Sequence, residues 1–301
     1  MGPLYRRVGH SEVSTSDAFG YSRQNPSPMP FRSHIARSFD FGRWSNVAIT
    51  ALVGATGAAA LILWVSGTAG VVLLAPAHAF LSWAILREID PDHEWPALIG
   101  AAGASIWSLT GQPVASAGAS LGLLVASRVV VRSTGRRLLG TDIVGLVALG
   151  VVIGYTVEGW VAGFGLAIAL YIDQRLDGSE RLLGMVAASV TAIGVTVVSA
   201  ALGVFPETTL ELRPLLAALA GAGALLMIVR DPADPVSRVD ARHRSPMDSD
   251  RLHVARSLVS LLVVGMVFFT GSASDGLVPL VSLIFLAVAR NEIELLMRRS
   301  R

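Results

Sequence analysis

The stretch SNVAITALVGATGAAALILWVS, residues 45–66, decides the fold class of this 301-residue chain. It runs for 22 consecutive residues without an ionisable side chain. An α-helix of that length extends about 33 Å, which is enough to cross the hydrocarbon region of a bilayer. Because a helix that is apolar on all sides must be surrounded by lipid or by protein, this stretch predicts a transmembrane helix.

Nine further apolar runs repeat the pattern. The chain is 52% hydrophobic and only 15% charged, whereas a soluble domain carries roughly a quarter charged residues. We therefore predict an all-α, polytopic transmembrane helix bundle of about ten spans. Several runs are shorter than the roughly 20 residues of a comfortable span, and eight spans result if 142–173 forms one re-entrant unit. The ten runs cover residues 45–66, 69–87, 96–111, 114–131, 142–157, 159–173, 182–204, 213–229, 254–271 and 276–290.

Short turns connect the runs on one side of the predicted bundle. They are rich in Gly, Ser, Thr and Pro and lie at residues 66–68, 111–113, 158–159 and 271–274. These residue types favour tight turns because they adopt or stabilise turn conformations. We expect the ten runs to pair into five helical hairpins.

Arginine marks the other side. The first run is preceded by arginines and every even-numbered connection contains them, whereas the opposite turns hold only Arg213. Cytoplasmic loops of membrane proteins carry an excess of basic residues, so both termini are predicted to be cytoplasmic. All 24 basic residues are arginine, which is typical of a GC-rich prokaryotic genome. We expect a multi-pass protein of the plasma membrane of a prokaryotic cell.

The two long polar segments are interpreted as cytoplasmic. Residues 1–43 are rich in Ser, Pro, Gly and Arg, a composition that cannot bury a core, so we expect a disordered tail. The transmembrane domain then extends over residues 44–301, with a solvated cytoplasmic loop at residues 231–253. At the end of that loop, the residues from Asp248 to Arg251 resemble a capped helix start.

Several classes of chemistry are excluded by composition. The chain has no cysteine and no lysine, which rules out disulfides, thiolate metal sites and Schiff-base catalysis. No triad, phosphate loop or nucleotide fingerprint occurs, and no basic stripe alternates with aromatic residues. We expect no cofactor and no nucleic-acid partner. The predicted partner is the lipid bilayer.

Small residues four apart predict close helix contacts. In lipid, such pairs allow two helix backbones to approach each other. They favour a compact bundle, and they allow association with a second copy or with other membrane proteins. The pairs are Gly118 with Gly122, Gly150 with Gly154, and Gly159 with Gly163.

His78 is the one ionisable residue near the middle of an apolar run. Pro76 precedes it by two residues and is expected to kink the helix by removing a hydrogen bond. A histidine inside the membrane can relay a proton or bind a substrate. The alternative is a neutral imidazole that a backbone carbonyl or a hydroxyl satisfies. No Asp, Glu or Arg lies at the centre of a run, and Arg128, one turn inside the edge, is expected to extend to the membrane surface.

Two acidic segments follow even-numbered runs. Asp90 and Asp92 lie among four carboxylates and a histidine in residues 87–94, and Asp173 and Asp177 follow the sixth run. Carboxylates at a membrane surface can hold a divalent cation together with phosphate. The alternative is an ordinary turn and helix start, because Asp, Pro and His are common there.

Two resemblances bear on these residues. The D-x-x-x-D pattern of Asp173 and Asp177 resembles the second aspartate motif of the UbiA-type intramembrane prenyltransferases. That resemblance implies a metal-dependent prenyl-transfer site, but the segment 87–92 departs from that family's first motif, which opens with Asn-Asp. The length, ten spans and cytoplasmic termini also look like the drug/metabolite transporter superfamily, by architecture alone.

Three functions follow from the sequence. The first is a transporter or permease-like protein for a small or lipidic solute. The alternatives are a structural or assembly subunit of a membrane complex and a membrane-embedded enzyme that modifies lipids or prenyl chains. His78 would serve the first, and the acidic segments would serve the last. Whether the chain is an enzyme is left open, and a non-enzymatic role is favoured.

Overall fold

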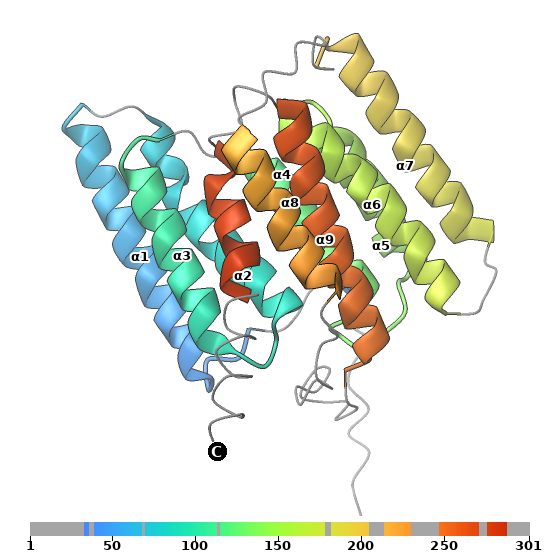
Figure 1. The fold of residues 1–301 in the computed structure, drawn as a ribbon, viewed down its shortest axis with the longest axis horizontal. Helices are drawn as coiled ribbons and strands as arrows, with labels where there is room; N and C mark the ends of the chain where they lie inside the picture. The colour runs from blue at the N-terminus through green and yellow to red at the C-terminus, as the bar shows by residue number, and fades with distance from the viewer. Residues whose placement is uncertain are drawn as a thin grey trace, which may run out of the picture. The chain divides into compact units, whose positions relative to one another are not determined.

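The chain is helical throughout the part that the structure describes (Figure 1). The computed structural model describes residues 33–35, 39–67, 70–112, 115–177, 182–204, 214–229, 247–270 and 276–287, and none of these lies in a β-strand. The all-α prediction is confirmed. The helices are α1 (Trp44–Val65), the 3₁₀ helix η1 (Gly70–Leu74), α2 (Ala75–Ile89), α3 (Glu94–Leu109), α4 (Ala117–Val131), α5 (Gly140–Ile153), α6 (Val157–Leu176), α7 (Leu182–Ala201), α8 (Pro214–Val229), α9 (Ser249–Thr270) and the helix Val278–Ala287.

Each predicted apolar run overlaps an α-helix, and run 69–87 also includes η1. Four segments are long and apolar enough to cross a membrane by length and composition, namely Trp44–Val65, Val72–Ile89, Leu182–Ala201 and Ser249–Phe269. Helix α6 has 20 residues, as many as α7, but is not one of the four, and the remaining helices have 16 residues or fewer. Most of the predicted tail 1–43 and most of the predicted loop 231–253 lie outside the described residues.

The predicted kink at Pro76 is wrong. The run 69–87 does not form one helix, because η1 ends at Leu74 and α2 begins at Ala75. Pro76 therefore lies in the first turn of α2, where a backbone N–H has no intrahelical acceptor and proline costs nothing. His78 consequently lies near the start of α2 rather than in the middle of a kinked helix.

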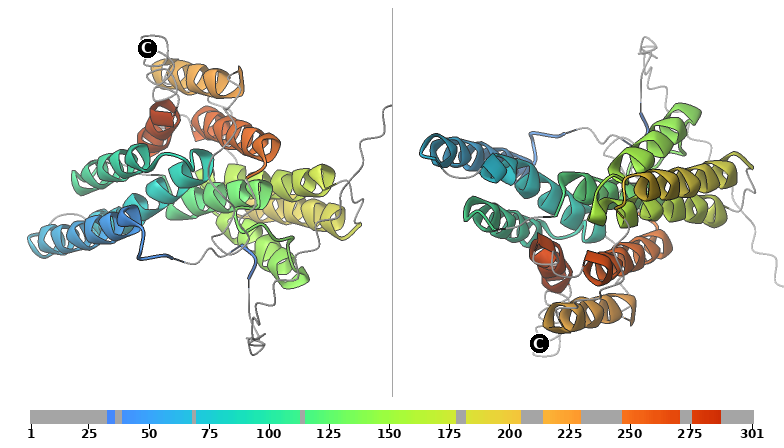
Figure 2. Two further views of the ribbon diagram at one scale, coloured as in Figure 1. Left: turned by 90° about the horizontal axis from the view of Figure 1, so that it is seen from below. Right: turned by 90° about the horizontal axis from the view of Figure 1, so that it is seen from above.

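Four helices form the inside of the bundle. Helix α4 packs against α2, α6 and α9, and α6 also packs against α5, α7 and α9. Helix α3 packs against α2 and α1, α7 packs against α5 and α6, and α8 packs against α9. Among the described residues, the predicted hairpins of run 96–111 with 114–131 and of run 182–204 with 213–229 are therefore wrong. The pairs α1–α2 and α5–α6 do pack together. Figure 2 shows α4 and α6 between the flanking helices in both views.

Glycine permits the closest helix contacts, as the spacing predicted. A Cβ atom at Gly122 of α4 would lie 2.8 Å from the Cβ of Ala162 on α6. One at Gly163 would lie 2.8 Å from the carbonyl oxygen of Gly150 on α5. Since Cβ and backbone atoms cannot move aside cheaply, Gly122 of α4 and Gly163 of α6 accept only glycine at the present helix separation.

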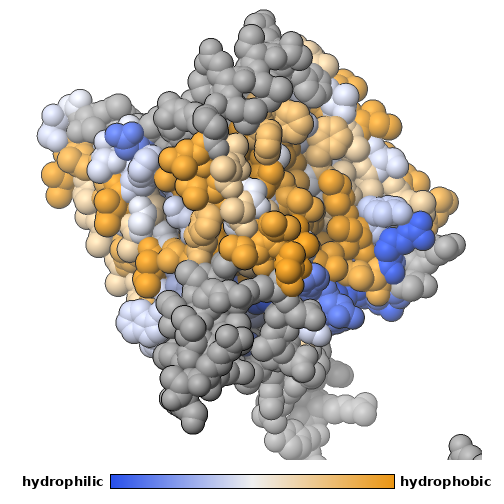
Figure 3. All heavy atoms as spheres, in the orientation of Figure 1, coloured by the Kyte–Doolittle hydropathy of each residue, from blue (hydrophilic) through white to orange (hydrophobic). Residues whose placement is uncertain are grey.

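The outward surfaces of the helices are apolar. Only 17% of the α1 span and 28% of the α7 span is buried, against 72% of Val72–Ile89. Large side chains such as Ile62, Val144 and Ile193 are exposed, and Figure 3 shows hydrophobic side chains across the middle of the visible face with hydrophilic ones along its lower edge. Exposed Trp44 and Trp64 lie at the two ends of α1, about 30 Å apart along the helix axis.

Candidate functional site

An arginine–carboxylate network lies where α2, α4 and α6 end and α9 begins. Helix α4 and its C-cap contribute two arginines to it, and α9 contributes two more. One arginine of α4 and one of α9 contact the carboxylates at the end of α2. The second arginine of each contacts the carboxylates at the end of α6. We call this set the paired-arginine network: Arg128, Arg132, Arg251, Arg256, Glu88, Asp90, Asp173 and Asp177.

Local structure explains where the arginines point. Arg128 and Arg132 are four residues apart, which places them on one side of the helix. Helix α4 stops at Arg132, whose φ of 51° and ψ of 49° put it in the left-handed region. At the start of α9, Asp248 accepts hydrogen bonds from the backbone N–H groups of Asp250 and Arg251. The predicted helix start at Asp248 is thereby confirmed.

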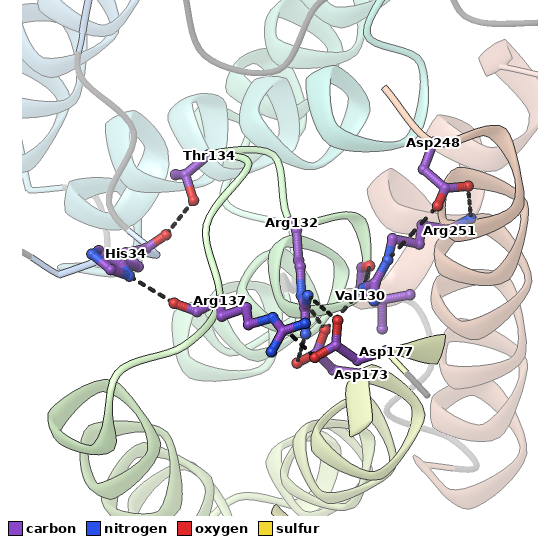
Figure 4. A network of polar contacts seen from close by, with 9 residues as sticks. All are labelled: His34, Val130, Arg132, Thr134, Arg137, Asp173, Asp177, Asp248 and Arg251. Carbon is purple, nitrogen blue, oxygen red and sulfur yellow. Dashed lines mark hydrogen bonds and ion pairs between the residues drawn. The ribbon is translucent and has the colours of Figure 1, made fainter. Parts of the chain in front are cut away.

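Asp173 is the centre of the α6 half of the network (Figure 4). Arg132 Nε donates to its Oδ1 at 2.6 Å and Arg132 Nη2 to its Oδ2 at 2.9 Å. Arg251 Nη1 donates to Oδ1 at 2.9 Å and also to the carbonyl oxygen of Val130 at 3.0 Å. Asp173 is only 1% exposed, and both of its oxygens accept charge-assisted hydrogen bonds.

Asp177 extends the α6 half toward the surface. It receives Arg132 Nη1 at 2.9 Å and Arg137 Nε at 3.1 Å. Burial opposes the positive charge of Arg132, but the hydrogen bonds and charges of Asp173 and Asp177 outweigh burial and raise the pKa of Arg132. Arg132 therefore stays protonated and links α4 to the end of α6.

The α2 half has a different arrangement. Arg128 Nε donates to Glu88 Oε1 at 2.8 Å. Arg256 Nε donates to the carbonyl oxygen of Ile89 at 2.6 Å, while its Nη2 lies 4.0 Å from Asp90 Oδ1. His93 Nδ1 lies 2.9 Å from that same Asp90 oxygen. Glu88 is 1% exposed, and its second oxygen, Oε2, has no hydrogen-bond partner among the described residues.

The segment Ser33–Ile35 lies against the connection between α4 and α5, beside the network (Figure 4). Thr134 Oγ1 donates to the carbonyl oxygen of His34 at 2.5 Å, and His34 Nδ1 donates to the carbonyl oxygen of Arg137 at 2.6 Å. The backbone N–H of His34 donates to Asp142 Oδ2 at 3.0 Å. Three hydrogen bonds thus attach this part of the predicted tail to the bundle.

His78 lies at the opposite end from the network. It is buried, its Nε2 lies 3.0 Å from the carbonyl oxygen of Ala115, and its Nδ1 lies 3.5 Å from Ser108 Oγ. The backbone N–H of Ala115 donates to the carbonyl oxygen of Gly276 at 2.8 Å. His78 therefore links α2 to α3 and to the residues before α4, which is the satisfied imidazole that the sequence offered as the alternative. Its role as a relay stays a prediction.

The predicted acidic site is occupied by cations of the protein itself. Asp173 and Asp177 do converge, but on Arg132, and Asp90 lies beside Arg256 and His93. Asp92 is half-buried in the turn between α2 and α3. Among the described residues, no group of three His, Asp or Glu side chains could hold a metal ion. The geometry favours internal ion pairs over the predicted cation site at Asp90, Asp92, Asp173 and Asp177.

Sequence reasoning missed the partners of these carboxylates. Arg128 does not extend away from the bundle, because its Nε reaches Glu88 and its side chain is only 20% exposed. Arg256 lies about two turns inside α9. A single arginine near a helix end is usual at a membrane surface and therefore does not by itself indicate a buried ion pair. The two pairs of closely spaced arginines, Arg128 with Arg132 and Arg251 with Arg256, were the sequence feature that could have indicated the network.

Comparison with protein family models, curated proteins and solved structures finds no match to this chain. The network itself therefore carries the functional argument. Its members come from four inner helices, and its bonds are ion pairs that can break and form again when helices move.

Proposed function

We propose that this chain is a multi-pass membrane protein. The exposed apolar side chains of α1 and α7 support this, because a soluble protein of this size would bury most of them. Trp44 and Trp64 support it as well, since tryptophan favours the two membrane interfaces and their separation matches the hydrocarbon thickness. We further propose that the arginine-rich end faces the cytoplasm and that the remaining helices, α6 and the shorter ones, also span the membrane.

Within the membrane, the proposed activity is that of a permease-like carrier for a small or lipidic solute, and the paired-arginine network is its closed cytoplasmic gate. The observation that carries this proposal is that buried ion pairs join α2, α4, α6 and α9 at one end of an otherwise apolar bundle. Apolar residues would hold these helices together at least as firmly, because desolvating charges offsets much of their attraction. Ion pairs suit a contact that must open.

The second candidate is a structural subunit of a membrane complex. The contacts at Gly122 and Gly163 favour it, because such close packing suits a bundle that does not rearrange. A carrier and a structural subunit differ in one respect that can be measured. Water reaches the inside of a carrier when its gate opens, and it never reaches the inside of a static bundle.

Ser260 offers a position for this measurement. It is fully buried on α9, four residues beyond Arg256 and therefore on the same side of the helix, one turn deeper. Its hydroxyl has no hydrogen-bond partner among the described residues. Since the chain lacks cysteine, Ser260→Cys introduces a single thiol just inside the proposed gate.

The experiment uses the full chain in vesicles and a charged thiol reagent that cannot cross lipid. We expect the thiol of Ser260→Cys to react slowly in the otherwise unchanged protein. When Asp173→Asn removes the central carboxylate, the thiol should react at least about tenfold faster. A loss of about 1.4 kcal/mol from the closed state is enough to raise the population of the open state tenfold. Ile193→Cys, on the exposed face of α7, is the control and should stay unreactive in lipid. A Ser260→Cys thiol that never reacts in either folded background contradicts the carrier and favours the structural subunit.

A further inference from the structure

Glu88 is the buried carboxylate that the network leaves half satisfied. Its Oε1 accepts from Arg128 Nε at 2.8 Å, whereas Oε2 has no hydrogen-bond partner among the described residues. Asp173, equally buried, has both oxygens occupied by arginine. A fully ionised carboxylate is costly to bury with one oxygen unpaired, because that oxygen has lost its water.

Several ionisable groups lie around Glu88. Arg128 faces it from α4, and Arg256 comes from α9 to the carbonyl oxygen of the next residue, Ile89. Helix α1, η1 and the helix Val278–Ala287 contain no ionisable residue. The other charged or titratable groups of this end include Arg87 on α2, Asp90, Asp92 and His93 in the turn that follows, Glu94 at the start of α3, Arg132 at the C-cap of α4, and Arg251 and His253 on α9.

Protonation of Glu88 would change one contact selectively. A proton on Oε2 converts the carboxylate to a neutral acid, which removes the charge that Arg128 faces. The hydrogen bond from Arg128 Nε to Oε1 then joins a cation to a neutral oxygen and loses much of its strength. Asp173 would keep its contacts with both Arg132 and Arg251. The α2 side of the gate would loosen while the α6 side stayed joined.

We propose that Glu88 is the proton-binding site of this protein and that the carrier is proton-coupled. One proton passes from water at the arginine-rich end to Glu88 Oε2, the Glu88–Arg128 pair loses its charge attraction, and α2 separates from α4. When the proton leaves, the carboxylate and Arg128 pair again. Water can reach this pair, since the side chain of Arg128 is 20% exposed and that of His93 is 28% exposed. This inference rests on the carrier function proposed above and names its coupling ion.

A distance measurement between two spin labels tests the proposal. Val47→Cys in the first turn of α1, which packs against α2, and Leu176→Cys at the end of α6 are both exposed positions. The chain has no other cysteine. The doubly labelled protein in lipid nanodiscs should show a longer distance component that grows as pH falls from 8 to 5. One coupled proton changes the ratio of open to closed protein by at most about tenfold per pH unit.

The variants identify the group that binds the proton. Glu88→Gln, which imitates the protonated acid, should give the low-pH distribution at every pH. Glu88→Asp keeps an ionisable group and should keep a pH response. His93→Gln is the matched control at the same end and should respond to pH as the unsubstituted protein does.

Each outcome has a distinct meaning. A response that survives Glu88→Gln, or that His93→Gln abolishes, overturns the assignment of Glu88 but leaves a gated carrier. A longer label distance that is present at every pH in the same proportion also overturns the assignment of Glu88 and leaves a gated carrier. A single unchanging distance in all variants, with Ser260→Cys unreactive, overturns the carrier and the proton site together.

Discussion

The carboxylates at the end of α6 and those at the end of α2 face the same two sources of arginine, α4 with its C-cap and α9. At the α6 end, Asp173 receives two arginines and no oxygen is left over. At the α2 end, Glu88 receives one arginine and keeps an unpaired oxygen, while Arg256 lies 4.0 Å from Asp90. The same kinds of residue thus form one saturated contact and one incomplete contact. The difference indicates a stable contact at the end of α6, which we call the α6 joint, and a contact that opens more easily at the end of α2, which we call the α2 joint.

The largest expected effect comes from breaking the saturated contact. Asp173→Asn leaves Arg132 and Arg251 facing a neutral amide, and an uncompensated buried charge costs about 3–5 kcal/mol. We expect the free energy of unfolding in detergent, measured by titration with a denaturing surfactant, to fall by about that amount. Asp177→Asn is the control, because Arg132 keeps Asp173, and it should cost clearly less. Equal losses in the two variants would contradict the central position of Asp173.

The α2 contact should be weaker when measured in the same way. Hydrogen bonds that involve charged groups contribute about 1.5–3 kcal/mol, and Glu88 uses only one oxygen. A double-mutant cycle with Glu88→Gln and Arg128→Gln should therefore give a coupling energy of about 2 kcal/mol at pH 8. At pH 5 the coupling should decrease, because protonation removes the charge of Glu88. A coupling as large as that between Asp173 and Arg132, and independent of pH, would make the two joints equivalent.

How far the sequence predicts this arrangement depends on the range of the interaction. The ten apolar runs and the arginine-rich connections are local properties, and each run overlaps an α-helix. The pairing of arginines with carboxylates depends on contacts between residues far apart, such as Arg256 and Ile89, which are 167 positions apart. Hydropathy gives no help, because the inner and the outer faces of these helices are both apolar and no period distinguishes them.

Two differences between expectation and structure have specific physical causes. Pro76 was expected to kink a helix, but it begins one, because the run 69–87 breaks into η1 and α2. The sequence left two interpretations of Asp173 and Asp177 open, a site for a cation from solution or an ordinary turn, and in the structure both carboxylates pair with Arg132 of the same chain. Residue types at a given spacing predict which charge a site attracts, and they do not predict where that charge comes from.

His78 provides a reference outside both joints. It lies at the other end of α2 and satisfies Ala115 with one hydrogen bond, a contact that typically contributes about 1 kcal/mol. We expect His78→Ala to lower the free energy of unfolding by about 1–2 kcal/mol and to leave the pH-dependent label distance unchanged. If His78→Ala abolishes the pH response while stability is retained, the proton site is not Glu88 but His78, in the relay role that was one of the two interpretations of its sequence.

The smallest effect is expected at the rim of the α6 joint. Arg137 reaches Asp177 at 3.1 Å, but its side chain is 53% exposed, and exposed ion pairs contribute about 0–1 kcal/mol because water and salt screen them. Arg137→Gln should therefore change the free energy of unfolding by less than about 0.5 kcal/mol. The same substitution at Arg132 should cost several times more, since Arg132 is largely buried and binds both carboxylates. If the two substitutions cost the same, burial does not distinguish the inner part of the joint from its rim, and Asp173 loses its special status.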